Sequence, residues 1–399
     1  MNKIKYSILM PTYNKAEYIK YSIKSILESK YQNFELIISN DYSTDGTAKI
    51  LSKIKDPRVK IIKPPFRLNH VRNYEFLLKY ANGEWITIIG DDDGIIPNFF
   101  ENVDKYLNKF PQIKAISSKP ALYYWKNVED FYGDRVCDYQ NFNEDAKIKN
   151  SKITLFLCLL GILNRTDVPM LYTSGIVKRS LIDRIKMISN NFFFHGLLPD
   201  YYSSVAILSY TKNFLRINEP LFWVGTSKKS VGRGIKTYES KYNNEKKLSF
   251  INPKLKLNKN ISPKIHQIGF SPMYFYEALI NVPYLKKFWN KKIIKYFVFS
   301  ATDYAYSKNQ FRFKIPITDK EFNSLLYLQI KKENLSIQFY YLFKIIILFL
   351  NLISDLIIFI KKIYLYFKKK GSKKYKILVS KDRSQFKNFI ICNDYLEKM

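Results

Sequence analysis

The stretch Gly83-Glu84-Trp85-Ile86-Thr87-Ile88-Ile89-Gly90-Asp91-Asp92-Asp93 joins a short apolar run to three consecutive carboxylates. The apolar part is typical of a buried β-strand. Carboxylates packed in a row repel one another and lose hydration unless a cation or water neutralises them. Three aspartates at the carboxyl end of a strand therefore predict a site for a hard divalent ion, and the alternative is a solvated acidic turn.

Strand-like and helix-like segments alternate around this stretch. The expected strands cover residues 6–10, 34–39, 59–62 and 85–89, and the expected helices cover residues 16–27, 45–54, 69–81 and 97–109. This alternation predicts a parallel sheet with helices on both faces. Ligands of such sheets bind beyond the carboxyl ends of the strands, so the loops that follow the strands should carry the chemistry. The later expected elements are strands at 115–118 and 176–177 and helices at 151–163, 201–208 and 273–306.

Two more loops fit this expectation. Ser39-Asn40-Asp41-Tyr42-Ser43-Thr44-Asp45-Gly46-Thr47 follows the second strand, and its Asp and Asn side chains could accept hydrogen bonds from a nucleobase or a ribose. The alternative is that Ser43, Thr44 and Asp45 cap the next helix. Pro11-Thr12-Tyr13-Asn14 follows the first strand, where Tyr13 could stack on a base or stand in an ordinary turn.

In this order and spacing, the three loops resemble those of the family 2 glycosyltransferases. The match runs through residues 6–19, 43–47, 72–73 and 83–86, and it becomes thinner after about residue 110. The resemblance implies a GT-A fold, which is an α/β fold with a Rossmann-like, mostly parallel sheet and helices on both faces, here with a helical C-terminal extension. It also implies inverting transfer of a sugar from a nucleotide-diphosphate sugar to a hydroxyl of a saccharide or lipid-linked acceptor, with a Mn²⁺ or Mg²⁺ ion.

The resemblance further implies roles for single residues. Pro11, Thr12 and Tyr13 would line the nucleobase pocket, Asp41 would contact the base, and Arg72 would lie near the diphosphate. The aspartate run corresponds to a motif that is commonly Asp-X-Asp-Asp, but Gly90 stands where the first Asp would be. Asp92, and after it Asp93, are then the expected metal ligands, with Asp91 on the donor side. Which carboxylate contacts the metal and which the ribose stays open.

The reaction needs a base to take the proton of the acceptor hydroxyl. The resemblance implies an acidic residue at the start of a helix in the second half, and Asp200 is the best match, in Phe194-His195-Gly196-Leu197-Leu198-Pro199-Asp200. Asp200 could instead only cap that helix, and His195 is the rival base. The segment 173–179 resembles the strand that shapes the acceptor side. The segment 223–232 resembles a mobile loop whose lysines, Lys228 and Lys229, meet the diphosphate or are solvated.

The charge of the chain is strongly positive, with 66 Lys and Arg against 34 Asp and Glu. Nucleic acid, an anionic membrane and codon bias compete as explanations. Nucleic-acid binding is disfavoured, because the basic and aromatic residues form no recognisable module and the acidic run would repel phosphate. A dinucleotide oxidoreductase is disfavoured by the lack of Gly-x-Gly-x-x-Gly after the first strand. A non-catalytic nucleotide-sugar-binding protein of the same fold remains the alternative to an enzyme.

The C-terminal part contains the most apolar stretch, residues 339–367. Its core, 345–360, includes Asn351, Ser354 and Asp355, and Lys361, Lys362 and residues 368–370 follow it. Three interpretations are open: a helix packed on the catalytic domain, a helix lying in the inner leaflet with its lysines on anionic headgroups, or a membrane span.

The expected organisation has five parts. A nucleotide-sugar-binding half at 1–110 and an acceptor-binding half at 111–232 are followed by a basic connection and helical region at 233–335, a hydrophobic helix at 336–370 and a tail at 371–399. The start of the chain lacks the features of a signal peptide, and its three cysteines are far apart. Both observations favour the cytoplasm, with peripheral membrane contact at its cytoplasmic face.

Overall fold

The computed structural model describes residues 4–68, 70–125, 128, 137–140, 146–195, 198–230, 271–282, 291–309, 318–369 and 377–380. Its centre is an eight-stranded sheet in the order β3-β2-β1-β4-β10-β6-β11-β9. These strands are β1 (Tyr6–Thr12), β2 (Phe34–Asn40), β3 (Val59–Ile62), β4 (Trp85–Ile88), β6 (Ala115–Ser118), β9 (Ala146–Asn150), β10 (Gly175–Lys178) and β11 (Asn213–Ile217).

The first half of the sheet is parallel, as the sequence predicts. β1 pairs in parallel with β2 and β4, and β2 pairs in parallel with β3. The expected strands at 59–62 and 115–118 have the observed bounds of β3 and β6. β10 is antiparallel to both of its neighbours, β4 and β6, so the sheet is mixed and mostly parallel, which agrees with the α/β fold class.

Alternate residues of β1 enter two hydrophobic cores, one on each face of the sheet. Ile8 and Met10 pack with α1 (Ile19–Leu27) and α4 (Phe99–Lys109), whereas Leu9 packs with α3 (His70–Leu78). A strand that is buried on both faces is apolar at every position, which explains the unbroken run from Ile8 to Met10. The chemistry is therefore confined to the ends of the strands.

Several expected helices are shorter than predicted, and one is divided. The helix expected at 16–27 begins only at Ile19, because Asn14 has a positive φ of 55° and Lys15 begins a turn. The helix expected at 45–54 is α2 (Thr47–Leu51), which follows Gly46 at φ 93°. The single helix expected at 273–306 is wrong: α12 (Ser271–Asn281) and α14 (Lys292–Asn309) are separate.

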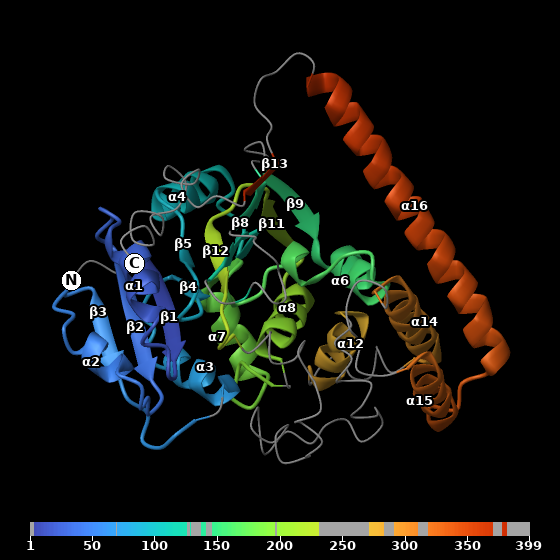
Figure 1. The fold of residues 1–399 in the computed structure, drawn as a ribbon, viewed down its shortest axis with the longest axis horizontal. Helices are drawn as coiled ribbons and strands as arrows, with labels where there is room; N and C mark the ends of the chain where they lie inside the picture. The colour runs from blue at the N-terminus through green and yellow to red at the C-terminus, as the bar shows by residue number, and fades with distance from the viewer. Residues whose placement is uncertain are drawn as a thin grey trace.

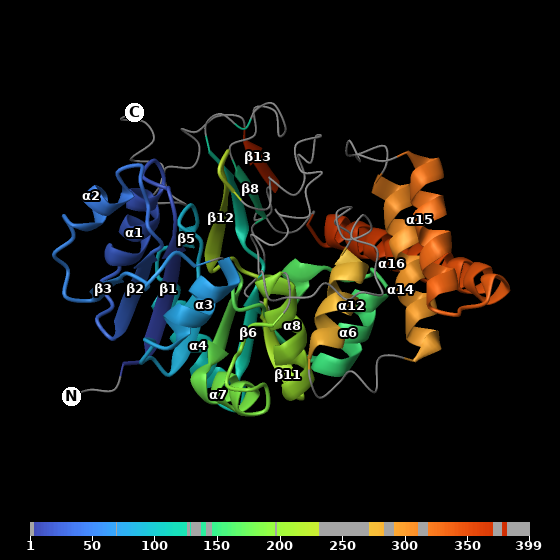
Figure 2. The ribbon, with the colours of Figure 1, turned by 90° about the horizontal axis from the view of Figure 1, so that it is seen from below.

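A second sheet has the order β13-β8-β7-β12-β5 and lies over the loops that follow the main strands (Figure 2). Its strands are β5 (Gly94–Ile95), β7 (Ala121–Tyr124), β8 (Cys137–Gln140), β12 (Phe222–Thr226) and β13 (Ile377–Ser380). β12 connects the two halves of the chain, because it pairs with β5 from the first half and with β7. Of the tail expected at 371–399, only β13 lies within the described residues.

Helices complete the second half of the molecule. α6 (Ser151–Leu159), α7 (Arg179–Met187), α8 (Pro199–Tyr210) and α12 pack beside the sheet, and α14, α15 (Asp319–Lys332) and α16 (Ile337–Lys369) form the outer layer (Figure 1). α16 agrees with the helix expected at 336–370. Residues 231–270, where the sequence predicts a basic connection, lie outside the described part of the chain.

Candidate active site

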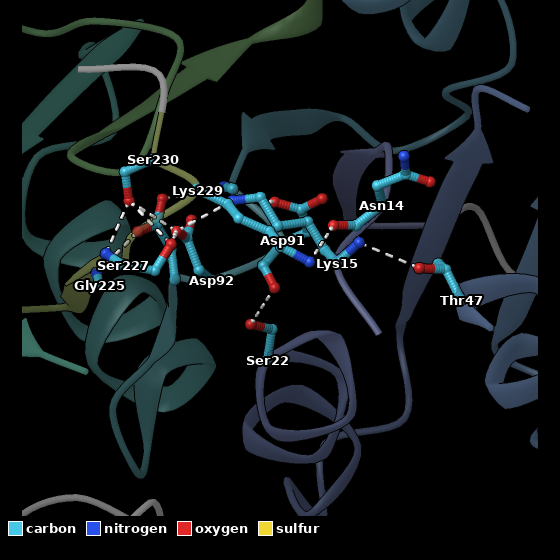
Figure 3. Close-up of polar contacts among 12 residues, drawn as sticks. Asn14, Lys15, Ser22, Thr47, Asp91, Asp92, Gly225, Ser227, Lys229 and Ser230 are labelled. Carbon is cyan, nitrogen blue, oxygen red and sulfur yellow. Dashed lines mark hydrogen bonds and ion pairs between the residues drawn. The ribbon is translucent and has the colours of Figure 1, made fainter. Parts of the chain in front are cut away.

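The loops after β1 and β4 meet around one buried ammonium group. Lys15 Nζ lies 3.3 Å from Asp91 Oδ1 and 3.0 Å from Asp92 Oδ2. Figure 3 shows the Lys15 side chain pointing to these two carboxylates. Lys15 is only 8% exposed, and although burial lowers its pKa, the two carboxylates outweigh this effect and raise it above the usual value. The first two aspartates of the run therefore share a cation that the protein itself supplies.

Asp92 also holds the segment that follows β12. The hydroxyls of Ser227 and Ser230 donate to Asp92 Oδ2 at 2.5 and 2.7 Å. In the same segment, Lys229 Nζ donates to the backbone oxygen of Asn14 at 3.3 Å and lies 3.7 Å from Asp45 Oδ2. The segment 227–230 thus lies over the aspartates and reaches the loops after β1 and β2, where the sequence predicts a loop that covers the donor.

Asp93 is fixed by three donors other than Lys15. The backbone nitrogens of Gly225 and Gly90 donate to its two oxygens at 2.8 and 3.0 Å, and the Thr173 hydroxyl donates at 2.7 Å. Burial and the neighbouring charge of Asp92 raise the pKa of Asp93 to about 7, against these hydrogen bonds. Asp93 therefore ties β12 and the segment before β10 to the aspartate loop.

The surroundings also shift the pKa values of Asp91 and Asp92, in opposite directions. Burial raises the pKa of Asp91, and Lys15 and the neighbouring Thr12 hydroxyl offset this only in part. Burial acts on Asp92 in the same direction, but Lys15, Ser227 and Ser230 together lower its pKa below the usual value. Asp92 is consequently the more firmly ionised member of the pair.

The structure explains why glycine occupies position 90. A Cβ atom there would lie 2.5 Å from Asp93 Oδ2 and 2.7 Å from the Tyr172 hydroxyl. Asp93 is buried and fixed by three donors, so it cannot easily move away, and Tyr172 is partly buried. A motif with a first aspartate at this position would be incompatible with the way in which Asp93 is held.

The predicted nucleobase residues lie at the adjoining loops. Asp41 is 5% exposed and accepts a hydrogen bond from the Leu68 nitrogen at 2.7 Å, and its own nitrogen donates to Thr12 at 2.9 Å. Burial raises the pKa of Asp41, against the Leu68 hydrogen bond and the charge of Arg67. The Arg67 guanidinium lies over the Tyr13 ring, 4.2 Å from its centre, and this is the ring on which the sequence predicts that a base could stack.

Pro11 and Thr12 are buried at the end of β1, beside these groups. Arg72 is half-buried on α3. It lies two residues after His70, roughly 200° around the helix, so the two side chains leave the helix on different sides.

Asp45 accepts hydrogen bonds from the Thr47 nitrogen and hydroxyl at 3.2 and 2.6 Å. This is the helix-start role that the sequence offers as an alternative for this residue.

Asp200 lies in the first turn of α8 and forms an ion pair with Arg165 at 2.9 Å. The charges of Asp200, Asp93 and Asp91 all raise the pKa of buried Tyr74, after burial itself. The base candidate and two aspartates of the run therefore act electrostatically on the same tyrosine. His195, the rival base, contacts the carbonyls of Ser189 and Phe192 through Nε2, both at 3.1 Å, so that this nitrogen already has partners.

Sequence reasoning missed Lys15, Arg165 and His70. The His70 ring packs 4.4 Å from the Tyr74 ring, and burial lowers the His70 pKa to about 4, partly offset by Asp200 and reinforced by Lys15. Asp200 and Lys15 thus both act electrostatically on a neutral imidazole. Their positions in the sequence could have indicated Lys15 and His70. Each stands at the end of a loop that follows a predicted strand, and parallel sheets bind ligands at the edge where such loops lie.

The residues present fit a divalent cation. The described part of the chain has no cluster of three or more His, Cys, Asp or Glu side chains that could hold a metal. Asp91 and Asp92 nevertheless direct one oxygen each at a single cation. Mg²⁺ is commonly held by one or two carboxylates together with substrate phosphates, so this pair provides the protein's share of such a site.

Comparisons with known proteins concern mainly the first part of the chain. Residues 7–158 match the family described as Glycosyl transferase family 2. The chain is 34% identical over 160 residues to the Escherichia coli UDP-Glc:alpha-D-GlcNAc-diphosphoundecaprenol beta-1,3-glucosyltransferase WfgD, covering 40% of this chain and 60% of that protein. It is 37% identical over 166 residues to the E. coli enzyme of the same activity, WfaP, covering 41% and 61%.

Solved structures give a more distant likeness. S. aureus TarS 1–349 in complex with UDP-GlcNAc aligns with 85% of this chain and 90% of its own chain, at 14% identity and a TM-score of 0.46. The matches to the first curated relatives span between 35% and 61% of their lengths.

Proposed function

We propose that this chain, which carries a glycosyl transferase family 2 domain at residues 7–158, transfers a sugar from a nucleotide-diphosphate sugar to a hydroxyl of a saccharide or lipid-linked acceptor. The reaction is a single displacement with inversion at the anomeric carbon. The observation that carries the proposal is the convergence of Asp91, Asp92, Lys15 and the segment 227–230 at the carboxyl ends of β1 and β4.

The donor side of the site consists of three groups. Asp41 and Tyr13 bind the nucleobase, and Arg72 lies toward the diphosphate. Asp91 and Asp92 would hold a Mn²⁺ or Mg²⁺ ion, since Asp93, the second ligand expected from the sequence, already has three donors. When bound, the ion would neutralise the charge that develops on the leaving nucleoside diphosphate. Lys15 balances the two carboxylates while no metal is bound.

Asp200 is the proposed base. Arg165 fixes one oxygen of its carboxylate at 2.9 Å, and the other accepts the proton of the acceptor hydroxyl as this attacks the anomeric carbon. Neutral His70 feels the charges of both Asp200 and Lys15, and an uncharged imidazole can accept a hydrogen bond from a sugar hydroxyl or donate one to it. The segment 227–230 excludes water from the donor phosphates when it covers the site.

The test is a screen of the purified chain against UDP-, GDP- and dTDP-sugars with Mn²⁺, read first by thermal shift and then by release of nucleoside diphosphate. One donor should raise the melting temperature. Asp92→Ala and Asp200→Asn should each reduce turnover by at least about 100-fold, whereas Asp183→Asn, at an exposed position of α7, should not. If no donor changed the melting temperature, both the proposed glycosyltransferase and the alternative, a non-catalytic nucleotide-sugar-binding protein, would be rejected.

The acceptor proposed here is a sugar linked to a lipid diphosphate at the cytoplasmic face of a membrane. The printed activities of WfgD and WfaP, which act on GlcNAc-diphosphoundecaprenol, support this choice. Transfer to a short-chain lipid-diphosphate sugar, but not to the free sugar, is the expected result. Equal transfer to both would show that the lipid diphosphate is not recognised.

A further inference from the structure

Three polar side chains of α16, those of Tyr340, Lys344 and Asn351, lie on the side of the helix that faces the protein. Lys344 Nζ lies 2.7 Å from Asp303 Oδ2 of α14, and the Tyr340 hydroxyl donates to the same carboxylate at 2.7 Å. Asp303 is only 3% exposed. Asn351 is 6% exposed, and its amide donates to the Ile347 carbonyl at 2.9 Å. The side of α16 that contacts the body of the molecule is therefore partly polar.

Apolar contacts complete the inward side. Ile347 is fully buried against Leu160 and Ala301. The Phe343 ring stacks on the Tyr296 ring of α14 at 5.2 Å. These contacts and the Lys344–Asp303 pair fix which side of α16 faces α14.

The outward side of α16 is almost wholly apolar. From residue 339 to residue 357, the exposed positions are Phe339, Tyr341, Leu342, Ile345, Leu348, Phe349, Leu352, Ile353, Asp355, Leu356 and Ile357. Asp355, the only charged residue among them, is paired with Lys308 of α14 at 3.1 Å. Ile345 is 66% exposed and Phe349 is 63% exposed. Soluble monomers rarely expose a continuous apolar surface of this kind.

The spacing of these residues makes one continuous stripe. Tyr341, Ile345, Leu348, Leu352 and Leu356 recur at intervals of three or four residues, so they follow one line along the helix. α16 has 33 residues and is thus roughly 50 Å long. Figure 1 shows it along the outer edge of the molecule, with α14 on its inner side, and Figure 2 places it on the side away from β1–β3.

We propose that this outward stripe, residues 339–357, docks on the surface of an anionic lipid bilayer, with α16 lying in the plane of the interface. The positive charge of the chain indicates that the partner of the stripe is an anionic lipid surface. The last nine residues of α16 contain Lys361, Lys362, Lys368 and Lys369, and the whole chain carries a net charge of +32. An anionic headgroup layer attracts such a molecule, whereas a second copy would bring an equal positive charge.

The geometry favours an interfacial helix over a spanning one. The segment Ile337–Ile357 is long and apolar enough to cross a membrane. To do so, however, it would have to leave α14, breaking the Lys344–Asp303 pair and the Tyr340 hydrogen bond. A helix lying in the interface keeps all of these contacts. This docking does not depend on the proposed transfer activity, although it would bring the site close to a lipid-linked acceptor.

The experiment is sedimentation of the full chain with vesicles of phosphatidylcholine, alone or mixed with phosphatidylglycerol. The wild type should bind the mixed vesicles. The double variant Leu348→Glu/Leu352→Glu should bind them at least about tenfold more weakly, because two outward leucines are replaced by charges. The matched control is Ile153→Glu/Met187→Glu, which alters two side chains that are 62% and 78% exposed on α6 and α7, and it should bind like the wild type.

Three outcomes would overturn the proposal. One is no binding of the wild type to anionic vesicles at low ionic strength. Another is a wild type that is dimeric in solution while Leu348→Glu/Leu352→Glu is monomeric and neither binds vesicles, which would assign the stripe to a second copy. The third is resistance of the bound protein to alkaline carbonate extraction, which would indicate a span. Circular dichroism checks that the variants are folded, and donor thermal shifts test the proposed function separately.

Discussion

Lys15 is a single residue on which the site depends, because it balances two buried carboxylates. Replacing it in Lys15→Met leaves Asp91 and Asp92 without their cation, and removing one partner from a buried ion pair costs about 3–5 kcal/mol. We expect a lower free energy of unfolding in urea. We also expect that Mn²⁺ raises the melting temperature of Lys15→Met more than that of the wild type, since the ion then has no ammonium to displace.

The control for Lys15 is Lys229→Met. Lys229 lies 3.7 Å from Asp45 and its side chain is 46% exposed, so its loss should cost at most about 1 kcal/mol. If Mn²⁺ stabilised Lys15→Met no more than the wild type, Asp91 and Asp92 would not be the metal ligands.

The sequence pointed to the three aspartates of this site but not to the side chains that bind them, for a physical reason. Asp91–Asp93 form a local pattern, three acids directly after an apolar strand. Their partners are remote in sequence: Lys15 is 77 residues from Asp92, Thr173 is 80 from Asp93, and Ser227 is 135 from Asp92. Lysines and serines are common in loops, and only the folded sheet shows which of them reach the aspartates.

Gly90 leads to a second prediction at this scale. In Gly90→Ala, the new Cβ atom meets Asp93 and the Tyr172 hydroxyl at distances too short for atomic contact. Overpacking of this kind typically costs about 1–3 kcal/mol, and we expect a corresponding fall in the free energy of unfolding in urea, with loss of donor binding. Unchanged stability and binding would mean that Asp93 is not held as described.

His70 makes stability depend on pH. Its pKa is about 4 in the folded chain, below its ordinary value of 6.5, so the unfolded chain binds more protons between these two values. The stability that neutral His70 contributes is present above about pH 6.5 and is lost as the pH falls toward 4. His70→Gln should therefore flatten the fall in melting temperature in this window.

The matched control for His70 is His195→Gln, because the His195 ring contacts backbone carbonyls outside the group around Tyr74. A wild type and His70→Gln with parallel melting curves between pH 4 and 6.5 would contradict a buried, neutral His70.

At the scale of elements, the segment 227–230 is held over the site by its hydroxyls. Ser227→Ala/Ser230→Ala removes two hydrogen bonds to ionised Asp92, each worth about 1.5–3 kcal/mol. We expect hydrogen exchange of the backbone amides from 227 to 230 to become at least about tenfold faster. Ser204→Ala, which removes a hydroxyl bonded only to the Asp200 carbonyl in α8, is the control and should leave these amides unchanged.

The elements also show where sequence patterns stop being informative. The strands β1 to β4 were predictable, because each is a short apolar run between helices with their own periodicity. The antiparallel insertion of β10 between β4 and β6 was not, since strand pairing is decided by contacts between distant segments. In α16, the periodicity separates a polar side from an apolar one, but only packing on α14 shows that the polar side faces inward.

At the scale of the whole molecule, the excess of positive charge has a consequence for stability. A net charge of +32 places like charges close together in the folded chain and favours expansion. Added salt screens exposed charges, but it acts much less on a buried pair such as Lys15 with Asp92. We therefore expect the melting temperature to rise between low and physiological ionic strength, and the same change in salt to weaken binding to anionic vesicles. A melting temperature that fell over this range would mean that attractive surface pairs outweigh the repulsion, and the charge would then no longer argue for a lipid partner over a second copy.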